Sequence, residues 1–396
     1  MTPTTQPTDP ADPTDPADPA DPAAAAAPTP SPAWNMVIPS SRRSTDASRA
    51  GLVASPAPEE LGYDLVDRPT PPPVPNGWYA ATSSAALAIG DVESFIAVER
   101  QLVVFRDEAG AAHVLDAHCP HMGAHLGGGS VHGETLACPY HGWRFDGSGT
   151  AVEIPYSSSR IPSRACVRSY PVCEQDSIVL FWFHAAGAAP DYEVPTFDEA
   201  HDTTWSAPHE HRDELVASLQ DMAENNVDYT HFFFVHGRDA LDESTSQFRT
   251  DGPFSTVTER FEDQDLTFTR YTWGPGLALL RIPGIATVLT TTTPIDRRHV
   301  RLLWHFYFPP GSRSVADEII AGVIGEHGLG ADEPIWRDKV FLERPLLVKG
   351  DGPIPEFRRW YEQFYEGSRP NHASTGCDDA PGDAPPPTEP TEAAIR

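Results

Sequence analysis

Two Cys–His pairs stand close together in this chain. One residue separates Cys119 from His121, two residues separate Cys138 from His141, and sixteen residues lie between the pairs. Two thiolates and two imidazoles are the ligands of a [2Fe–2S] cluster in which His replaces Cys on one iron. A structural zinc site also uses Cys and His with short gaps, but it usually pairs Cys with Cys and His with His. The mixed pairs, each with a proline beside it, favour an iron–sulfur cluster, with zinc as the alternative.

The residues around these pairs carry a resemblance to a known signature. The first pair reads Cys-Pro-His-Met-Gly from Cys119, and the second reads Cys-Pro-Tyr-His-Gly-Trp from Cys138. Both resemble the signature of Rieske [2Fe–2S] proteins. The resemblance implies that Cys119 and Cys138 bind one iron and that His121 and His141 bind the other.

A second group of candidate ligands lies between residues 224 and 236. Glu224, Asp228 and His231 are spaced four and three residues apart, which on a helix would place them on one face. His236 would point about 140° away from His231 on a continuous helix, so the helix must end or distort for both imidazoles to reach one ion. Two His and one carboxylate with open positions are the non-haem iron(II) pattern that activates oxygen. The alternative is a helix end with two hydrogen-bonded histidines and no metal.

The spacing Asn225-x2-Asp228-x2-His231-x4-His236, downstream of the Cys–His pairs, resembles the oxygenase subunit of Rieske non-haem iron oxygenases. The resemblance implies that His231 and His236 bind a mononuclear iron(II). It also implies catalytic roles for Asn225 and Asp228. The carboxylate of Asp228 would be a bridge that hydrogen-bonds a cluster histidine of the neighbouring subunit, and not a ligand.

Three further segments are similar to one branch of that group. They are the Met-Gly after the first Cys-Pro-His, the three Phe between His231 and His236, and Arg-Arg-Trp-Tyr-Glu-Gln-Phe-Tyr at residues 358–365. The branch contains bacterial 3-ketosteroid 9α-hydroxylase oxygenases and animal cholesterol 7-desaturases. The likeness covers about residues 75–367, nearly all of the part expected to be ordered.

The resemblance also implies a third iron ligand, Asp332, in the segment Asp-Glu-Pro-Ile-Trp. A carboxylate there would compensate the charge of an iron that two neutral imidazoles hold. Pro334 leaves another interpretation open, because a proline near a helix start would make Asp332 an N-cap that accepts backbone N–H bonds. In that case Glu333 or Asp338 would be the substitute ligand.

The activity that the resemblance implies is that of a terminal monooxygenase component with a [2Fe–2S] cluster and a mononuclear Fe(II). Electrons would come from a ferredoxin-type or flavin/iron–sulfur reductase and reach the iron of a neighbouring subunit in a homotrimer. There O2 would hydroxylate or desaturate a steroid- or sterol-like, apolar polycyclic substrate. No G-x-G-x-x-G occurs in a strand–helix context, so NADH or NADPH would act only through the reductase.

Six apolar residues of the second half are candidates for the substrate pocket: Trp273, Leu277, Leu279, Leu280, Trp304 and Phe306. Two other functions stay open. One is the tailoring of a polycyclic secondary metabolite, and the other is an electron-carrier protein that lacks the mononuclear iron.

The charge of the chain narrows the classes of partner. The formal net charge is -29, which repels nucleic acid and anionic membrane surfaces. The N-terminus has no signal-peptide pattern, and no apolar run approaches the length of a membrane span. We therefore expect no nucleic-acid partner, no membrane span and a cytoplasmic location.

The pattern of apolar residues and turns predicts an α+β protein that presents these ligands on two domains. We expect a disordered Pro/Ala/Asp-rich tail and linker over 1–74, an all-β Rieske domain over 75–185, a catalytic domain over 186–367 and a disordered tail over 368–396. The catalytic domain should contain an antiparallel sheet with hairpins at 254–273 and 286–308. It should also contain helices near 214–230, 315–324 and 335–341.

Overall fold

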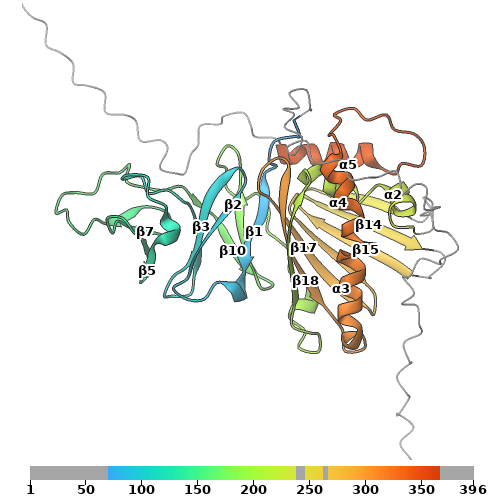
Figure 1. The fold of residues 1–396 in the computed structure, drawn as a ribbon, viewed down its shortest axis with the longest axis horizontal. Helices are drawn as coiled ribbons and strands as arrows, with labels where there is room; N and C mark the ends of the chain where they lie inside the picture. The colour runs from blue at the N-terminus through green and yellow to red at the C-terminus, as the bar shows by residue number, and fades with distance from the viewer. Residues whose placement is uncertain (1–69, 238–245, 262–265, 366–396) are drawn as a thin grey trace, which may run out of the picture. The chain divides into compact units, whose positions relative to one another are not determined.

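The computed structural model describes residues 70–237, 246–261 and 266–365. The predicted disordered tails lie outside these residues, apart from the short stretch 70–74. Antiparallel sheets make up most of the described chain, with a few short helices packed on one of them (Figure 1). No helix among the described residues is long and apolar enough to cross a membrane.

Three antiparallel sheets of short strands form the first half of the described chain. Their orders are β2-β3-β4-β9, β5-β6-β7-β8 and β1-β11-β10. The strands are β1 (Gly77–Ser83), β2 (Val92–Ala97), β3 (Arg100–Arg106), β4 (Ala112–Asp116), β5 (Ser130–His132), β6 (Thr135–Ala137), β7 (Arg144–Asp146), β8 (Ala151–Glu153), β9 (Ser169–Tyr170), β10 (Val172–Gln175) and β11 (Ile178–Phe183).

The core of this half encloses the two cysteines of the sequence motif. Cys119 and Cys138 pack among buried side chains of β3, β4, β6 and β7, including Phe105, Leu115 and Phe145. The strands that carry these apolar residues therefore fix the depth of both thiols, and the two motif loops extend from that core.

One seven-stranded antiparallel sheet forms the second half, in the order β12-β18-β17-β16-β15-β14-β13. Both predicted hairpins are present in it. The strands are β12 (His209–Val216), β13 (Gln247–Asp251), β14 (Phe254–Phe261), β15 (Leu266–Trp273), β16 (Leu277–Ile282), β17 (Ala286–Pro294) and β18 (His299–Tyr307).

Within the described residues, five α-helices accompany this sheet: α1 (Leu219–Glu224), α2 (Tyr229–Phe234), α3 (Ala316–Ile324), α4 (Leu329–Asp338) and α5 (Ile354–Tyr361). The prediction of one helix over 214–230 is wrong. Residues up to Val216 belong to strand β12, and the helical part is divided into α1 and α2. The predicted helix at 335–341 begins earlier, at Leu329, and ends at Asp338.

The two faces of the seven-stranded sheet have different neighbours. On one face, Thr293 Oγ1 donates to the Ala80 carbonyl of β1 at 2.9 Å, and Tyr307 OH donates to the Asp176 carbonyl at 3.2 Å. The other face carries the helices, as α2 packs on Phe268 and Ile282. The first face thus adjoins the β1-β11-β10 sheet, and the second (the helix-side face) adjoins the candidate iron site.

The arrangement of the two faces shows that three of the six predicted pocket residues are wrong. Trp273, Leu277 and Leu279 belong to the core shared with the β1-β11-β10 sheet, where Trp78 and Trp182 are their neighbours. They cannot line a pocket on the opposite face. Leu280, Trp304 and Phe306 occupy the alternate positions of their strands and lie on the helix-side face, because successive side chains of a strand point to opposite sides.

Candidate metal centres

The two Cys–His pairs form two similar turns, one after β4 and one between β6 and β7 (the cluster loops, residues 119–124 and 138–143). Each turn closes with a glycine amide that donates to the cysteine carbonyl. The distances are 2.9 Å from Gly123 to Cys119 and 3.0 Å from Gly142 to Cys138. Both glycines have positive φ, 75° and 70°, a conformation that costs little only without a Cβ. The glycine that follows each pair is therefore a requirement of the turn.

Within the cluster loops the thiols lie inside and the imidazoles lie nearer the surface. The two cysteines are 3% and 4% exposed, whereas His121 and His141 are partly exposed. The two imidazole rings are 4.7 Å apart between centroids, and the ring of Trp143 stacks on His121 at the same separation. The two loops thus bring two adjacent imidazoles to the surface above two thiols of one core.

The environment of the thiols fits an iron–sulfur cluster. Burial first, and the neighbouring thiol of Cys138 second, raise the pKa of Cys119 to about 11. A coordinated metal ion reverses this preference, because it removes the thiol proton outright. Two buried thiols beside two outer imidazoles are the donor set of a cluster with Cys on one iron and His on the other.

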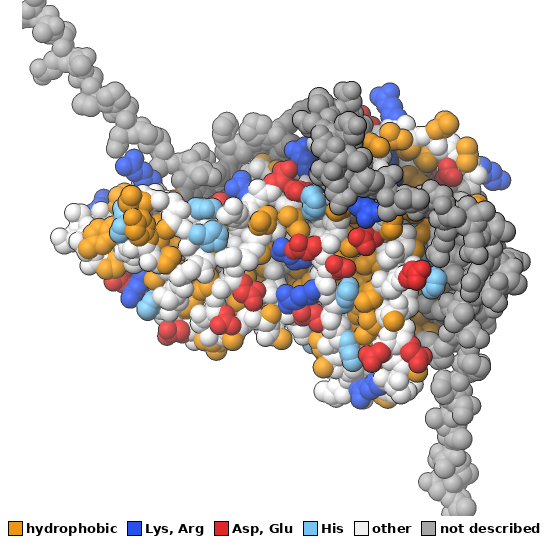
Figure 2. Space-filling view, viewed as in Figure 1, with side chains coloured by type: hydrophobic (Ala, Val, Ile, Leu, Met, Phe, Trp, Pro, Cys, Tyr) orange, Lys and Arg blue, Asp and Glu red, His pale blue; other side chains and the backbone are white. Residues whose placement is uncertain are grey.

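Large apolar and aromatic side chains are exposed around the cluster loops. Met122, Tyr140 and Tyr156 are each at least 60% exposed. Figure 2 shows hydrophobic side chains gathered at the end of the molecule that carries β5 to β8. Contiguous exposed apolar surface of this kind is typical of a site that contacts another protein.

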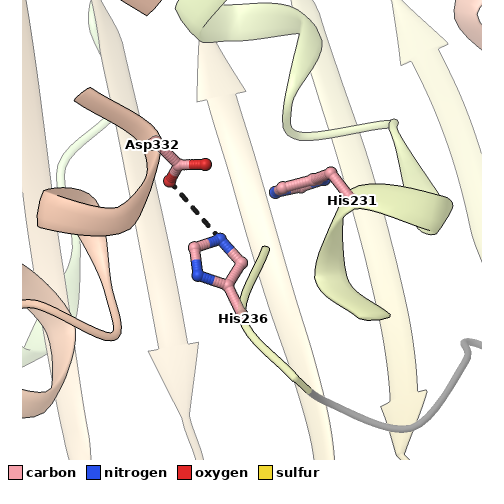
Figure 3. A group of neighbouring side chains, drawn as sticks. All are labelled: His231, His236 and Asp332. Carbon is pink, nitrogen blue, oxygen red and sulfur yellow. Dashed lines mark ion pairs between the residues drawn. The ribbon is translucent and has the colours of Figure 1, made fainter. Parts of the chain in front are cut away.

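The second centre brings together His231, His236 and Asp332 (the triad). One ligand atom from each lies within 4.8 Å of the others, and Asp332 Oδ2 is 3.4 Å from His236 Nε2. Figure 3 shows the carboxylate and both imidazoles pointing toward one another from three separate stretches of chain. Asp332 and His236 are only 7% and 9% exposed. Two imidazoles and one carboxylate are the donor set for non-haem iron(II).

Hydrogen bonds to backbone carbonyls fix the orientation of both imidazoles. Nδ1 of His231 bonds to the carbonyl of Asp228 at 2.5 Å, and Nδ1 of His236 bonds to the carbonyl of His327 at 3.1 Å. A carbonyl accepts only, so each Nδ1 carries the proton and each Nε2 keeps a free lone pair. Burial also lowers the pKa of His231, which favours the neutral form that binds a metal. The triad therefore fits an iron ion without rearrangement of its tautomers.

The break between α1 and α2 sets the spacing of the site. Helix α1 ends at Glu224, and Asp228 caps α2 by accepting from the His231 amide at 3.1 Å. Glu224, Asp228 and His231 therefore do not share one helical face, contrary to the prediction. Helix α2 ends at Phe234, so the helix stops before His236, as the spacing of the two histidines had required.

Asp332 lies inside α4, as its fourth residue. It is therefore not the N-cap that Pro334 had suggested. Pro334 is the sixth residue of the helix, beyond the first turn, so it removes the hydrogen bond that an N–H there would donate to the carbonyl of Gly330. Of the two substitute ligands, Glu333 is partly exposed and Asp338 is exposed, and neither belongs to the group of converging donors among the described residues.

Asn225 and Asp228 contact the triad without belonging to it. Nδ2 of Asn225 donates to Asp332 Oδ1 at 3.2 Å, which leaves Oδ2 directed at His236. One oxygen of Asp228 accepts from the His231 amide, and its other oxygen makes no hydrogen bond to any described residue. Asn225 thus orients a carboxylate, and Asp228 keeps a free acceptor at a partly exposed position.

A buried ion pair that the sequence did not indicate holds α1 in place. Arg358 of α5 donates to both oxygens of Glu224, each at 2.8 Å, and the Glu224 side chain is 7% exposed. Lys339, just after α4, pairs with Asp221 of α1 at 2.7 Å. The residue types alone gave no pairing signal, because Glu224 lies 134 residues from Arg358. Helices α4 and α5 are thereby both tied to the segment that leads into the triad.

Two family descriptions match the chain. Residues 77–171 match the Rieske [2Fe-2S] domain, and residues 181–365 match the 3-ketosteroid 9alpha-hydroxylase C-terminal domain. The predicted division at residue 185 itself stays a prediction.

Curated relatives match across both halves. The chain is 33% identical over 346 residues to cholesterol 7-desaturase nvd 1 of Ciona intestinalis, covering 78% of this chain and 72% of the relative. It is 31% identical over 336 residues to the probable 3-ketosteroid-9-alpha-monooxygenase, oxygenase component, of Rhodococcus rhodochrous, covering 76% of this chain and 82% of the relative.

Solved structures share the fold. Dicamba monooxygenase bound to dicamba aligns with a TM-score of 0.59 at 20% identity, over 73% of this chain and 96% of that one. NdmA of Pseudomonas putida CBB5 with caffeine aligns with a TM-score of 0.62 at 19% identity, over 72% and 89%. At this identity the likeness establishes the architecture alone.

Proposed function

This chain belongs to the Rieske non-haem iron oxygenases, in the branch of the 3-ketosteroid 9α-hydroxylases and cholesterol 7-desaturases, and from this premise we propose how its residues divide the work. Its cofactors are a [2Fe–2S] cluster and a mononuclear iron, and it is an oxidoreductase that depends on a separate reductase or ferredoxin. The proposed reaction is hydroxylation or desaturation of a steroid- or sterol-like substrate. One observation carries it: the same chain holds the paired cluster loops and the converging triad.

We assign the ligands as follows. Cys119 and Cys138 hold one cluster iron, and His121 and His141 hold the other. His231, His236 and Asp332 hold the mononuclear iron, since their free donor atoms face one another. When bound, the cluster supplies single electrons and the mononuclear iron supplies activation of O2.

The remaining residues position these donors. Asn225 fixes one oxygen of Asp332. The carbonyls of Asp228 and His327 hold the tautomers of His231 and His236. The apolar helix-side face beneath the triad, with Leu280 and Phe306, excludes water from the reacting carbon of the substrate.

Electron transfer between subunits is the proposed role of the free Asp228 carboxylate oxygen. The seven-stranded sheet separates the triad of one chain from its own β1-β11-β10 sheet, so the route within one chain must pass around or through the sheet. The exposed apolar surface at Met122 and Tyr140 suits docking on another copy. We propose a homotrimer in which Asp228 accepts a hydrogen bond from a cluster histidine of its neighbour. The cytoplasmic location stays a prediction, which cell fractionation tests.

The experiment combines the purified chain with a surrogate reductase, NADH, O2 and a panel of steroids and sterols, with products read by mass spectrometry. A product heavier by one oxygen indicates hydroxylation, and one lighter by two hydrogens indicates desaturation. Iron analysis should give about three irons per chain. About two irons, with no turnover of any steroid, would instead fit an electron carrier and contradict the proposal.

A further inference from the structure

The helix-side face of the seven-stranded sheet changes from apolar to polar between adjacent rows of side chains. One transverse row, read from the strand registers, contains Leu280, Val288 and Phe306 on β16, β17 and β18. The next row on the same three strands contains Ala278, Thr290 and Trp304, and His211 continues it on β12: Ala278–Thr290–Trp304–His211. An elongated ligand that lies along the strands on this face would therefore cross the apolar row and meet polar atoms at one end.

Two atoms in the polar row are buried without a hydrogen bond among the described residues. They are Nε1 of Trp304 and Nε2 of His211. The two residues are direct cross-strand partners, and Trp304 is only 8% exposed. Buried polar side-chain atoms are satisfied in the large majority of cases, because an unpaired one keeps its full desolvation cost. Two adjacent polar atoms without a partner therefore indicate a binding position for a polar group.

These atoms lie on the same face of the sheet as the helices that carry the triad. Helix α2, which carries His231, packs on Phe268 of β15 and Ile282 of β16. Helix α4, which carries Asp332, contacts β12. Strand β18 lies between these two positions in the sheet order, and Figure 3 shows strands passing behind the three triad side chains.

We propose that Trp304 Nε1, with His211 beside it, binds an oxygen function at one end of the substrate and so sets its orientation under the triad. This inference rests on the proposed function. An indole N–H only donates, so its partner must be an acceptor, such as a carbonyl or hydroxyl oxygen. Nε2 of His211 accepts or donates according to its tautomer, and the same pair therefore serves either oxygen. The rest of the substrate extends along the strands, across the apolar row.

The test measures equilibrium binding of three ligands to the iron-loaded protein: a steroid diketone and two analogues that each lack one carbonyl oxygen. Trp304→Phe keeps most of the ring and removes the donor. The affinity for the diketone should fall about tenfold, because one hydrogen bond typically contributes a binding free energy of this size. The affinity for the analogue that already lacks the recognised oxygen should not change. His211→Leu should weaken the same ligands and provides a second variant if Trp304→Phe fails to fold.

The matched control is Trp273→Phe, the same change at a buried tryptophan on the opposite face of the sheet; it should alter the affinity of none of the three ligands. Equal weakening of all three by Trp304→Phe, or no weakening, would overturn the inference while leaving the proposed function intact. Failure of the unmodified protein to bind any of the three would overturn the steroid substrate class and the inference with it.

Discussion

The cluster loops take all four proposed ligands from residues 119–141, whereas the triad and its support join segments as far apart as Asn225 and Asp332, 107 residues along the chain. Each cluster loop closes on itself through a glycine-to-cysteine hydrogen bond. The triad depends on a helix break, a distant helix and two backbone carbonyls. The first region is thus a local structure inserted in a core, and the second is a product of the tertiary fold. Substitutions should therefore affect the two regions independently.

The largest expected effect comes from Cys138→Ala, which removes a cluster ligand. The variant should lose the Rieske electron paramagnetic resonance signal and all product, yet keep its mononuclear iron. Electron paramagnetic resonance of the reduced protein, together with iron analysis, checks this prediction. Cys173→Ala is the control, because Cys173 is a partly buried free cysteine outside the loops. A Cys138→Ala protein that retains the signal would contradict the assignment.

Asp332→Ala should have the converse effect. The Rieske signal should stay at full intensity while mononuclear iron and product disappear, because two neutral imidazoles lack charge compensation for the ion. Asp338→Ala, at an exposed position of the same helix, should change neither. Full iron occupancy in Asp332→Ala would move the third ligand to another carboxylate.

Asp228→Asn tests the connection between the regions. The asparagine oxygen can still cap α2, so both metals should remain bound. Turnover should fall by roughly 10- to 100-fold, since residues that support metal ligands have effects of this size. Single-turnover reduction of the iron by pre-reduced cluster is the direct measurement. Loss of the mononuclear iron would instead make Asp228 a ligand.

A smaller effect is expected for Asn225→Ala, which removes the donor to Asp332 Oδ1. Affinity for mononuclear iron should fall about tenfold, measured by competition with a chelator, with the Rieske signal unaltered. Asn226→Ala, at the neighbouring position, is the matched control. Unchanged iron affinity would show that Asp332 needs no orienting partner.

The smallest effect concerns His305, on the sheet that separates the regions. Burial lowers its pKa below the ordinary value of 6.5, and the neighbouring Glu210 offsets this only in part. As the pH falls through 6.5, His305 therefore binds more protons in the unfolded chain than in the folded protein. The contribution of the neutral His305 to the free energy of unfolding is complete above pH 6.5 and is lost progressively below it. His305→Gln should reduce the fall in Tm on acidification below that pH, and should leave the iron content of both centres unchanged. An identical pH dependence in the two proteins would contradict the prediction.

The contrast between the regions also explains what could be predicted from the sequence. The hairpin of β14 and β15 was predictable, because alternating residues flank a short acidic turn. The helix predicted from residue 214 was wrong because Leu215 and Leu219 have helical spacing although one lies on a strand and the other on a helix. Ser218, whose side chain accepts from the Asp221 amide, was the available start signal.

The beginning of α4 had no such signal. Gly328, which precedes the helix, and Gly330 and Pro334 within it all have low helix propensity. The helix extends through Gly330 and Pro334 because its buried residues, Leu329 and Trp336 among them, pack against the rest of the domain. Likewise, no residue type could indicate that the His327 carbonyl orients His236, since a carbonyl is common to every residue. Sequence spacing thus identified the proposed ligands, and tertiary contacts determined how they are held.

The ion pair between Glu224 and Arg358 has a consequence for biosynthesis. Domains generally fold as units during synthesis, the N-terminal one first, and both cluster loops emerge from the ribosome long before Arg358 does. The cluster can be inserted into a finished core while α1 still lacks its partner on α5. Asp332, and the α5 arginine that holds α1, are synthesised later, so the electron-transfer centre can be complete before the oxygen-activating one, and a nascent chain cannot activate oxygen at a half-built site.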